Sequence, residues 1–309
     1  VLNRVADSIK KRGAAAGNII LFGHGSDGFN VCAIVDDFAY IVEKNCRNKR
    51  KKRYRRKVSC YLKEDNKKIY SKALNMITDF QCNMVYLSSS LRRESPKTYA
   101  SLVSALEKHG AEYRFLDNTH DIWCRDYMPV QVAEDTFCGF DYDPDYLHES
   151  KELLATRTDG NMVCHDLGLE VKQPATPLII DGGNVIRCDN KIIMIEKVFR
   201  ENNYSKDNLA KAIEEHFMAE LIVLPWDESE IYGHADGLVR YIGNDRVLIT
   251  NYDRFDKSFT RKVIEALRQH FKEVFKLEYN VQRQHKHNWA YINWLQTDKV
   301  LLIPSFGYP

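Results

Sequence analysis

The sequence has no apolar run long enough to cross a membrane, and its first residues lack the apolar core of a secretory signal. Its net charge is only +2 at pH 7, so no general attraction to polyanions is expected. Hydrophobic residues make up 44% and charged residues 28% of the 309 residues, as in an ordinary globular protein of one large or two smaller domains. We therefore expect a cytoplasmic protein with no membrane partner. An initiating methionine is also missing, which fits a chain that begins inside a longer reading frame.

The cysteines form no C-x-x-C pair, which argues against a zinc site of that spacing. A chain of this size does not need a disulfide scaffold, and nothing marks it for export, so we expect reduced thiols. No cysteine follows position 188. The eight cysteines are Cys32, Cys46, Cys60, Cys82, Cys124, Cys138, Cys164 and Cys188.

From Cys82 onward, strand patterns alternate with helix patterns. The stretch 95–110 is typical of a helix, with Ser95 as N-cap, Pro96 at the first helical position and Gly110 at the stop. Short apolar runs predict strands on either side of it, and Asp189–Asn190 is typical of a hairpin turn. A unit of strand, hairpin, helix and strand recurs roughly every sixty residues. This alternation predicts an α/β fold.

Residues 1–82 differ from the rest and match no family pattern, so we assign them to an N-terminal extension, with a second domain over residues 83–309. The extension contains the run RNKRKKRYRRK, residues 47–57, in which nine of eleven residues are Lys or Arg. Such a run either binds nucleic acid through phosphates or is a solvated charge block. We favour the solvated block, because no nucleic-acid-binding motif surrounds it.

The loop Gly23–Gly28 reads GHGSDG, which matches G-x-G-x-x-G after a predicted strand. A loop of this kind can hold a pyrophosphate where it opens a helix. A single match is a weak signal, and a plain polar loop is the favoured interpretation.

Three stretches combine acidic residues, glycines and a histidine at the ends of apolar runs. They read DIWCRDYMPV (121–130), IIDGGNVI (179–186) and GHADGLVR (233–240). Carboxylates beside glycines at strand ends are well placed to face a pocket. The alternative for each stretch is structural: aspartates that stabilise turns, a Trp123 that fills core, and a local Arg125–Asp126 ion pair.

The three stretches together resemble the agmatine deiminases and Porphyromonas-type peptidyl-arginine deiminases, members of the guanidino-group-modifying superfamily. That family carries W-x-R-D-x-G-P, E-G-G-N and G-H-x-D in this order, and this sequence has WCRDYMP, DGGN and GHAD. The later NWAYINWL and KVLLIPSFG extend the resemblance to the end of the chain. It implies a five-bladed β/α propeller (pentein) with the site at its axis.

The resemblance implies hydrolysis of a guanidinium to a ureido group with release of ammonia, on agmatine or on free or peptidyl arginine. Asp126 and Asp236 would pair with the two ends of the guanidinium fork, with Trp123 and Arg125 beside the substrate. His234 would act as general acid and then general base, oriented by Asp181. The resemblance implies no metal and no organic cofactor, and a place in polyamine metabolism if agmatine is the substrate.

The sequence departs from the family pattern in three places. Asp181 replaces a glutamate, which shortens the side chain that must reach His234. Met128 replaces a glycine before Pro129, which disfavours a positive φ there. The cysteine nucleophile, which would form a thiouronium intermediate, lies in the family beyond the segment where this chain stops. We therefore expect a truncated chain and an incomplete last blade, whose unpaired sheet edge would favour a homo-oligomer or another partner.

Resident residues offer weak substitutes for the nucleophile. Cys124 lies close to Asp126, but a small buried hydrophobe beside Trp123 is the favoured interpretation. The remaining tryptophans, Trp226, Trp289 and Trp294, line the pocket or fill the core, and core is favoured for at least two of them. Three functions stay open at this stage: a guanidino hydrolase, an inactive relative that binds a guanidinium, and a nucleic-acid-binding protein.

Overall fold

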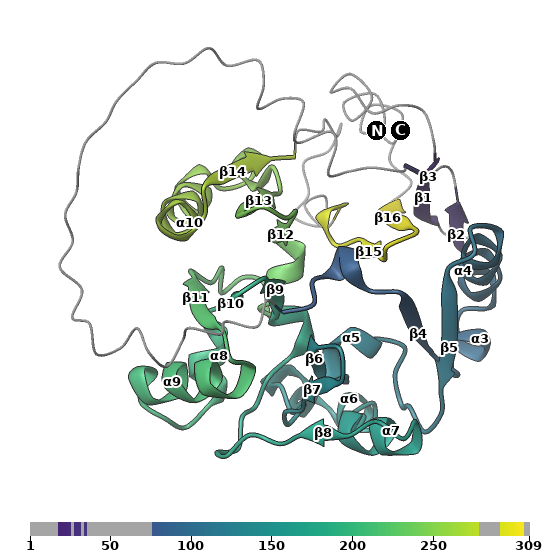
Figure 1. Cartoon of the computed structure of the whole chain (residues 1–309), viewed down its shortest axis with the longest axis horizontal. Helices are drawn as coiled ribbons and strands as arrows, with labels where there is room; N and C mark the ends of the chain where they lie inside the picture. Colours follow the sequence, from purple (N-terminus) through teal and green to yellow (C-terminus); the bar gives the residue numbers. More distant parts are fainter. Residues whose placement is uncertain (1–17, 26–27, 32–33, 36–75, 278–290, 306–309) are drawn as a thin grey trace, which may run out of the picture.

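The strands form five small sheets arranged around a common centre in a computed structural model of the chain (Figure 1). The structure describes residues 18–25, 28–31, 34–35, 76–277 and 291–305. The helices α4, α7, α9 and α10 lie toward the outside of the ring of sheets (Figure 1). This arrangement agrees with the α/β class and with the predicted five-bladed propeller.

Three of the sheets repeat one topology. In each, an antiparallel pair of strands is followed by a helix and by a third strand that joins the sheet in parallel. The strands are β6 (Val130–Ala133), β7 (Thr136–Cys138) and β8 (Val171–Lys172); β9 (Ile186–Cys188), β10 (Lys191–Ile195) and β11 (Glu220–Leu224); and β12 (Val239–Tyr241), β13 (Arg246–Ile249) and β14 (Glu273–Lys276). The repeat predicted from the sequence is the blade of this fold.

The other two sheets lie at the ends of the described chain. One pairs β4 (Met84–Ser88) in parallel with β5 (Glu112–Leu116). The other contains β15 (Leu295–Gln296), β16 (Leu301–Ser305), β1 (Asn18–Gly25), β2 (Gly28–Val31) and β3 (Ile34–Val35). In it β1 runs parallel to β16, so residues from the predicted extension share a sheet with the last described strand.

The hairpin geometry excludes the pyrophosphate loop considered for Gly23–Gly28. Gly23 and Gly25 lie in β1, Gly28 begins β2, and Gly25 is the partner of Gly28 in the antiparallel ladder. A pyrophosphate loop needs a helix at this point, and a strand is found instead. The basic run 47–57 lies outside the described residues.

Sequence signals explain where the outer helices begin and end. Ser95 is the N-cap and Pro96 the first residue of α4 (Pro96–Lys108), and Gly110 follows with φ of 63°. Asp256 caps α10 (Lys257–His270) by accepting from the Phe259 N–H at 2.9 Å. The other helices are α3 (Leu91–Glu94), α5 (Cys124–Tyr127), α6 (Lys151–Leu154), α7 (Gly160–Asp166), α8 (Lys197–Glu201) and α9 (Lys206–Phe217).

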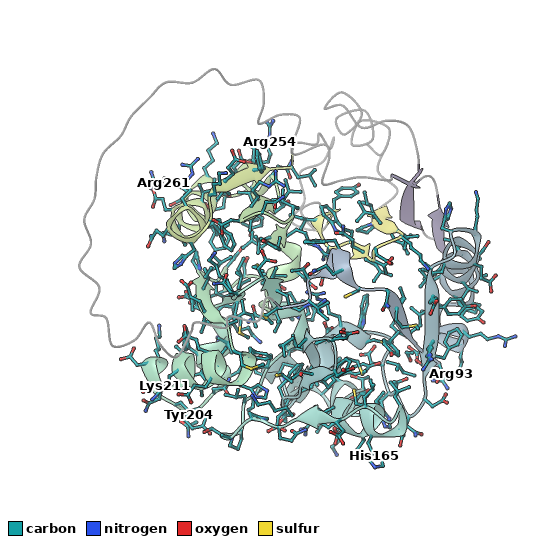
Figure 2. All side chains as sticks on the ribbon, viewed as in Figure 1. Arg93, His165, Tyr204, Lys211, Arg254 and Arg261 are labelled. Atoms are coloured by element: carbon teal, nitrogen blue, oxygen red, sulfur yellow. The ribbon has the colours of Figure 1, made fainter. Side chains whose placement is uncertain are left out.

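The core lies between the sheets and these helices. In α9, Leu209, Ile213 and Phe217 recur at helical spacing and are fully buried against β10 residues such as Ile192. The outward faces of the helices are polar. Arg93 of α3, Lys211 of α9 and Arg261 of α10 are exposed and point away from the sheets (Figure 2). Within the described ranges, the helices are all too short or too polar to cross a bilayer.

Candidate active site at the centre of the sheets

Each of the three predicted stretches contains a tight turn, and the turns meet. Asp126 lies in the one-turn helix α5, Asp181 caps the 3-10 turn η4 (Gly182–Asn184), and His234 precedes the turn η5 (Ala235–Gly237), which contains Asp236. The structure thus brings all four predicted acid, base and carboxylate residues together.

The two glycines of DGGN permit this close approach. A Cβ on Gly182 would collide with the backbone carbonyl of Arg125. A Cβ on Gly183 would lie 2.5 Å from Nδ1 of the His234 ring. Both positions therefore require glycine for steric reasons, because α5 and His234 pack directly on the turn.

Asp181 holds His234 in spite of its short side chain. Its Oδ2 lies 2.9 Å from Nε2 of His234, and its Oδ1 accepts from the Gly183 N–H at 2.9 Å. Burial alone would raise the pKa of Asp181, but His234 and the hydrogen bonds lower it below the ordinary value. Burial would likewise lower the pKa of His234, yet Asp181 and Asp126 raise it well above the usual range. The pair is an ion pair, with a protonated imidazole.

Tyr146 is a further member of the site that the sequence did not reveal. Its hydroxyl donates to Asp181 Oδ2 at 2.6 Å, the same oxygen that faces His234. Lys197, 1% exposed, lies over the Tyr146 ring at 5.4 Å, and Tyr232 packs edge-on against that ring. Lys197 is itself neutralised by Asp145 at 2.7 Å and Glu201 at 2.5 Å. Asp181 is therefore held by the buried Tyr146, which packs in turn against the buried Lys197.

Asp126 is the carboxylate without a partner. Its side chain makes no hydrogen bond or ion pair with the residues that the structure describes. Burial and the negative charges of Asp181 and Asp236 raise the pKa of Asp126 well above its usual value, against the pull of His234 and Arg125. An incoming cation would relieve this repulsion.

Asp236 is already paired with a guanidinium, that of Arg125. Arg125 Nε lies 2.9 Å from Asp236 Oδ2, and Arg125 Nη2 donates to the Val185 carbonyl at 2.7 Å. The amide of Asn293 donates to Asp236 Oδ1 at 3.1 Å, a contact that the sequence did not reveal. The local Arg125–Asp126 pair considered from the sequence is therefore not formed: Arg125 pairs with Asp236 instead.

Aromatic residues border this cluster. Trp123 is 62% exposed, so the interpretation of Trp123 as core is wrong, and its ring is free to face a ligand.

Asp121 does stabilise its turn, because it accepts from the Ile122 N–H at 2.5 Å. Trp294 is 4% exposed and buried, whereas Trp226 is half-buried. Trp289 lies outside the described residues.

The departure at Met128 is accommodated without strain. Met128 has φ of −79°, an extended conformation that any residue adopts. Its side chain packs against the core cluster that contains Tyr127 and Val130. Met128 therefore fits at this position without a positive φ, and its side chain contributes to the core.

Four of the described thiols, those of Cys124, Cys138, Cys164 and Cys188, are poor nucleophiles. Burial raises the pKa of Cys124 to about 11, and its sulfur accepts from the Tyr127 hydroxyl at 3.2 Å. Burial also raises the pKa of Cys138 and of Cys164 to about 11, and it raises the pKa of Cys188 well above its usual value. These groups are thiols at neutral pH, as expected for small buried hydrophobes.

A metal ion could in principle be held by Asp126, Asp181 and His234, because one ligand atom of each lies within 4.8 Å of the others. In this structure Asp181 binds Nε2 of His234 directly, at 2.9 Å.

Comparison with solved structures identifies the fold. The chain is similar to an agmatine deiminase from C. jejuni, with 16% identity, 76% of this chain and 82% of that one covered, and a TM-score of 0.52. It is also similar to an Enterococcus faecalis agmatine deiminase, with 14% identity, 76% and 84% covered, and a TM-score of 0.56. A cysteine-to-serine variant of the C. jejuni enzyme with substrate bound gives a TM-score of 0.56 at 15% identity over 76% and 83% of the chains. The fold is the pentein α/β fold.

A comparison with models of protein families identifies the family of the chain. The model of Porphyromonas-type peptidyl-arginine deiminase matches residues 55–309. The chain belongs to this family. A comparison with curated proteins found no match.

Proposed function

We propose that this site binds a guanidinium group and is built to hydrolyse it to a ureido group, with release of ammonia. The observation that carries the proposal is the unpartnered carboxylate of Asp126 beside the His234–Asp181 ion pair. A planar guanidinium is the cation that matches such a carboxylate with two parallel N–H donors. The family membership supports the same class of substrate.

Each residue has a proposed role in the reaction. Asp126 binds the guanidinium, and Asp236 takes the other end of it when Arg125 moves aside. The nucleophile bonds to the guanidinium carbon, His234 gives its proton to the departing nitrogen, and the C–N bond breaks to release ammonia. His234 then removes a proton from water, the oxygen of which displaces the nucleophile and completes the ureido product.

The nucleophile decides between two candidate functions. The resemblance implies a cysteine thiolate, but the buried thiols of Cys124, Cys138 and Cys164 all have raised pKa values. This observation argues against these three thiols as the nucleophile. Where no other thiol reaches the site, it binds a guanidinium without turning it over. Hydrolysis is proposed only where a thiol reaches the central carbon of the guanidinium that Asp126 binds.

One assay distinguishes guanidinium hydrolysis from guanidinium binding without turnover. The 309-residue chain is incubated with agmatine, with arginine and with an arginyl peptide, and ureido groups are measured by colorimetry while binding is followed by calorimetry. Binding without a ureido product supports the non-hydrolytic site. A ureido product that disappears in His234→Ala supports hydrolysis by this chain, and the preferred substrate identifies the class. Neither binding nor product with any of the three would contradict the proposed function.

A further inference from the structure

A cavity of about 350 Å³ lies beside the site, and three arginines line it. Arg125, Arg187 and Arg240 share it with Asp79, the one acidic residue among its described lining residues. The rest of the lining is mostly apolar and includes Met84, Val130 and Trp294. Asp126, Asp181, His234 and Asp236 are not part of the lining, so the cavity is distinct from the guanidinium site and is joined to it through Arg125.

The charges in this layer do not balance. Asp79 is paired with Arg187, with Arg240 at 2.7 Å and with Arg125 at 3.8 Å. Burial alone would raise the pKa of Asp79, but these three guanidinium groups bring it far below its usual value. Arg125 forms a second ion pair, with Asp236. Among the groups in direct contact, three cations thus face two carboxylates, which leaves one positive charge in excess. The free carboxylate of Asp126 acts on Arg125 only at longer range.

Arg240 carries the excess. It is 2% exposed, its Nη2 bonds to Asp79, and its Nη1 has no hydrogen-bond partner within the described part of the chain. Its guanidinium lies 5.4 Å from the centre of the Trp294 ring, which holds it in place. Burial lowers the pKa of Arg240, as do the like charges of Arg125 and Arg187, but a guanidinium remains charged at neutral pH. A buried N–H donor without an acceptor is costly, so an acceptor is expected beside it.

We propose that this cavity is a binding site for a small oxyanion, such as phosphate or a free carboxylate, held by Arg240 together with Arg187 and Arg125. Oxygen atoms of the anion accept from the unpaired Arg240 Nη1 and offset the excess charge. Guanidinium groups suit oxyanions because their donors are arranged as a fork. The anion also lies next to Arg125, so its binding affects the pairing of Arg125 with Asp236.

Inorganic phosphate is the probe for the first test. The 309-residue chain is titrated with phosphate by calorimetry at constant ionic strength, and sulfate and acetate are titrated in parallel to compare the two kinds of oxyanion. Arg240→Gln is expected to weaken the binding by about tenfold or more, because it removes a charge-assisted donor. The matched control is Arg246→Gln, since Arg246 is also buried with a free Nη2 but does not line the cavity.

A second measurement uses the reactivity of the Cys82 thiol. Cys82 lines the cavity, where its sulfur accepts from Arg187 Nη2 at 3.5 Å. Saturating phosphate is expected to slow the alkylation of Cys82 by iodoacetamide, as followed by peptide mass spectrometry, and Asp126→Asn is expected to leave this protection unchanged. The proposal is overturned by absence of saturable binding, by equal binding in wild type and folded Arg240→Gln, by an equal loss in Arg246→Gln, or by alkylation of Cys82 that does not respond to phosphate.

Discussion

His234 Nε2 lies 2.9 Å from Asp181 Oδ2, and the same oxygen accepts a hydrogen bond from the Tyr146 hydroxyl at 2.6 Å. The aspartate that stands in place of the family's glutamate therefore still reaches the histidine. It does so because the turn at Gly182 and Gly183 has no side chains to hold His234 away.

The first prediction concerns the charge of His234. Asp181→Asn removes the nearest carboxylate, so the pKa of His234 should fall from its raised value, which an NMR titration of the imidazole would measure. The pKa of His234 is higher in the folded protein than in the unfolded chain, where it is about 6.5. The stabilisation by the charged imidazole is therefore complete below about pH 6.5 and is lost as the pH rises through the folded-state pKa. Urea unfolding across this range should show the loss in wild type and little of it in Asp181→Asn. An unchanged His234 pKa would contradict the ion pair.

Tyr146→Phe tests the support behind Asp181. The variant keeps the ring contacts with Lys197 and Tyr232 but removes the hydroxyl, so we expect a loss of about 1 kcal/mol in the free energy of unfolding. The pKa of Asp181 should rise, because a hydrogen bond to its charged form is lost. Tyr142→Phe is a suitable comparison, since the Tyr142 hydroxyl contacts Tyr146 at 3.1 Å and not Asp181. An equal rise in the Asp181 pKa in both variants would argue against a specific role of Tyr146.

Gly183→Ala tests the close packing of the turn on His234. The added Cβ would lie 2.5 Å from the imidazole, so the ring must shift and guanidinium binding should weaken. Gly110→Ala is the control, because a Cβ at position 110 would meet open space. Gly110 has a positive φ, so the variant should be less stable but should bind the guanidinium as wild type does. Calorimetry with agmatine and urea unfolding are measured on both. Undiminished binding in Gly183→Ala would show that the position of His234 does not depend on this glycine.

The buried Lys197 gives a prediction with a defined pH dependence. Lys197→Met leaves the side chain of Glu201, which is 4% exposed, without its cation, at an expected cost of about 3 kcal/mol at neutral pH. The pKa of Glu201, already raised by burial, should rise further, so the lost stability returns as the pH falls and the carboxyl becomes protonated. Urea unfolding at neutral and mildly acidic pH measures this. Adding Glu201→Gln should restore stability at neutral pH, and a failure to do so would implicate packing instead of charge.

Local patterns predicted the α/β alternation, and the resemblance of three motifs to a known family predicted the propeller and the convergence of the site. The hairpin at Asp189–Asn190 and the helix capped at Ser95 are set by neighbouring residues, so the sequence reveals them. The motif residues Asp126, Asp181, His234 and Asp236 meet because each lies in or at the start of a short turn, α5, η4 or η5, and these turns pack together.

Other parts depend on contacts between distant segments, which no local pattern encodes. Tyr146 lies 35 residues from Asp181, and Asn293 lies 57 residues from Asp236. The pairing of Arg125 with Asp236 instead of Asp126 follows from the placement of η5, and β1 joins β16 from opposite ends of the chain. The apolar run PLIID, residues 177–181, is typical of a strand, but within it only Ile179 forms a bridge, to Asp141.

The central claim, that Asp126 is the free carboxylate that receives a guanidinium, is tested most directly by a calorimetric titration of the 309-residue chain with agmatine. We expect saturable binding that weakens by about tenfold or more in Asp126→Asn, because a charge-assisted pair is lost. Binding should be unchanged in Asp207→Asn, an exposed aspartate in the first turn of α9. Equal binding in wild type and folded Asp126→Asn would contradict the account.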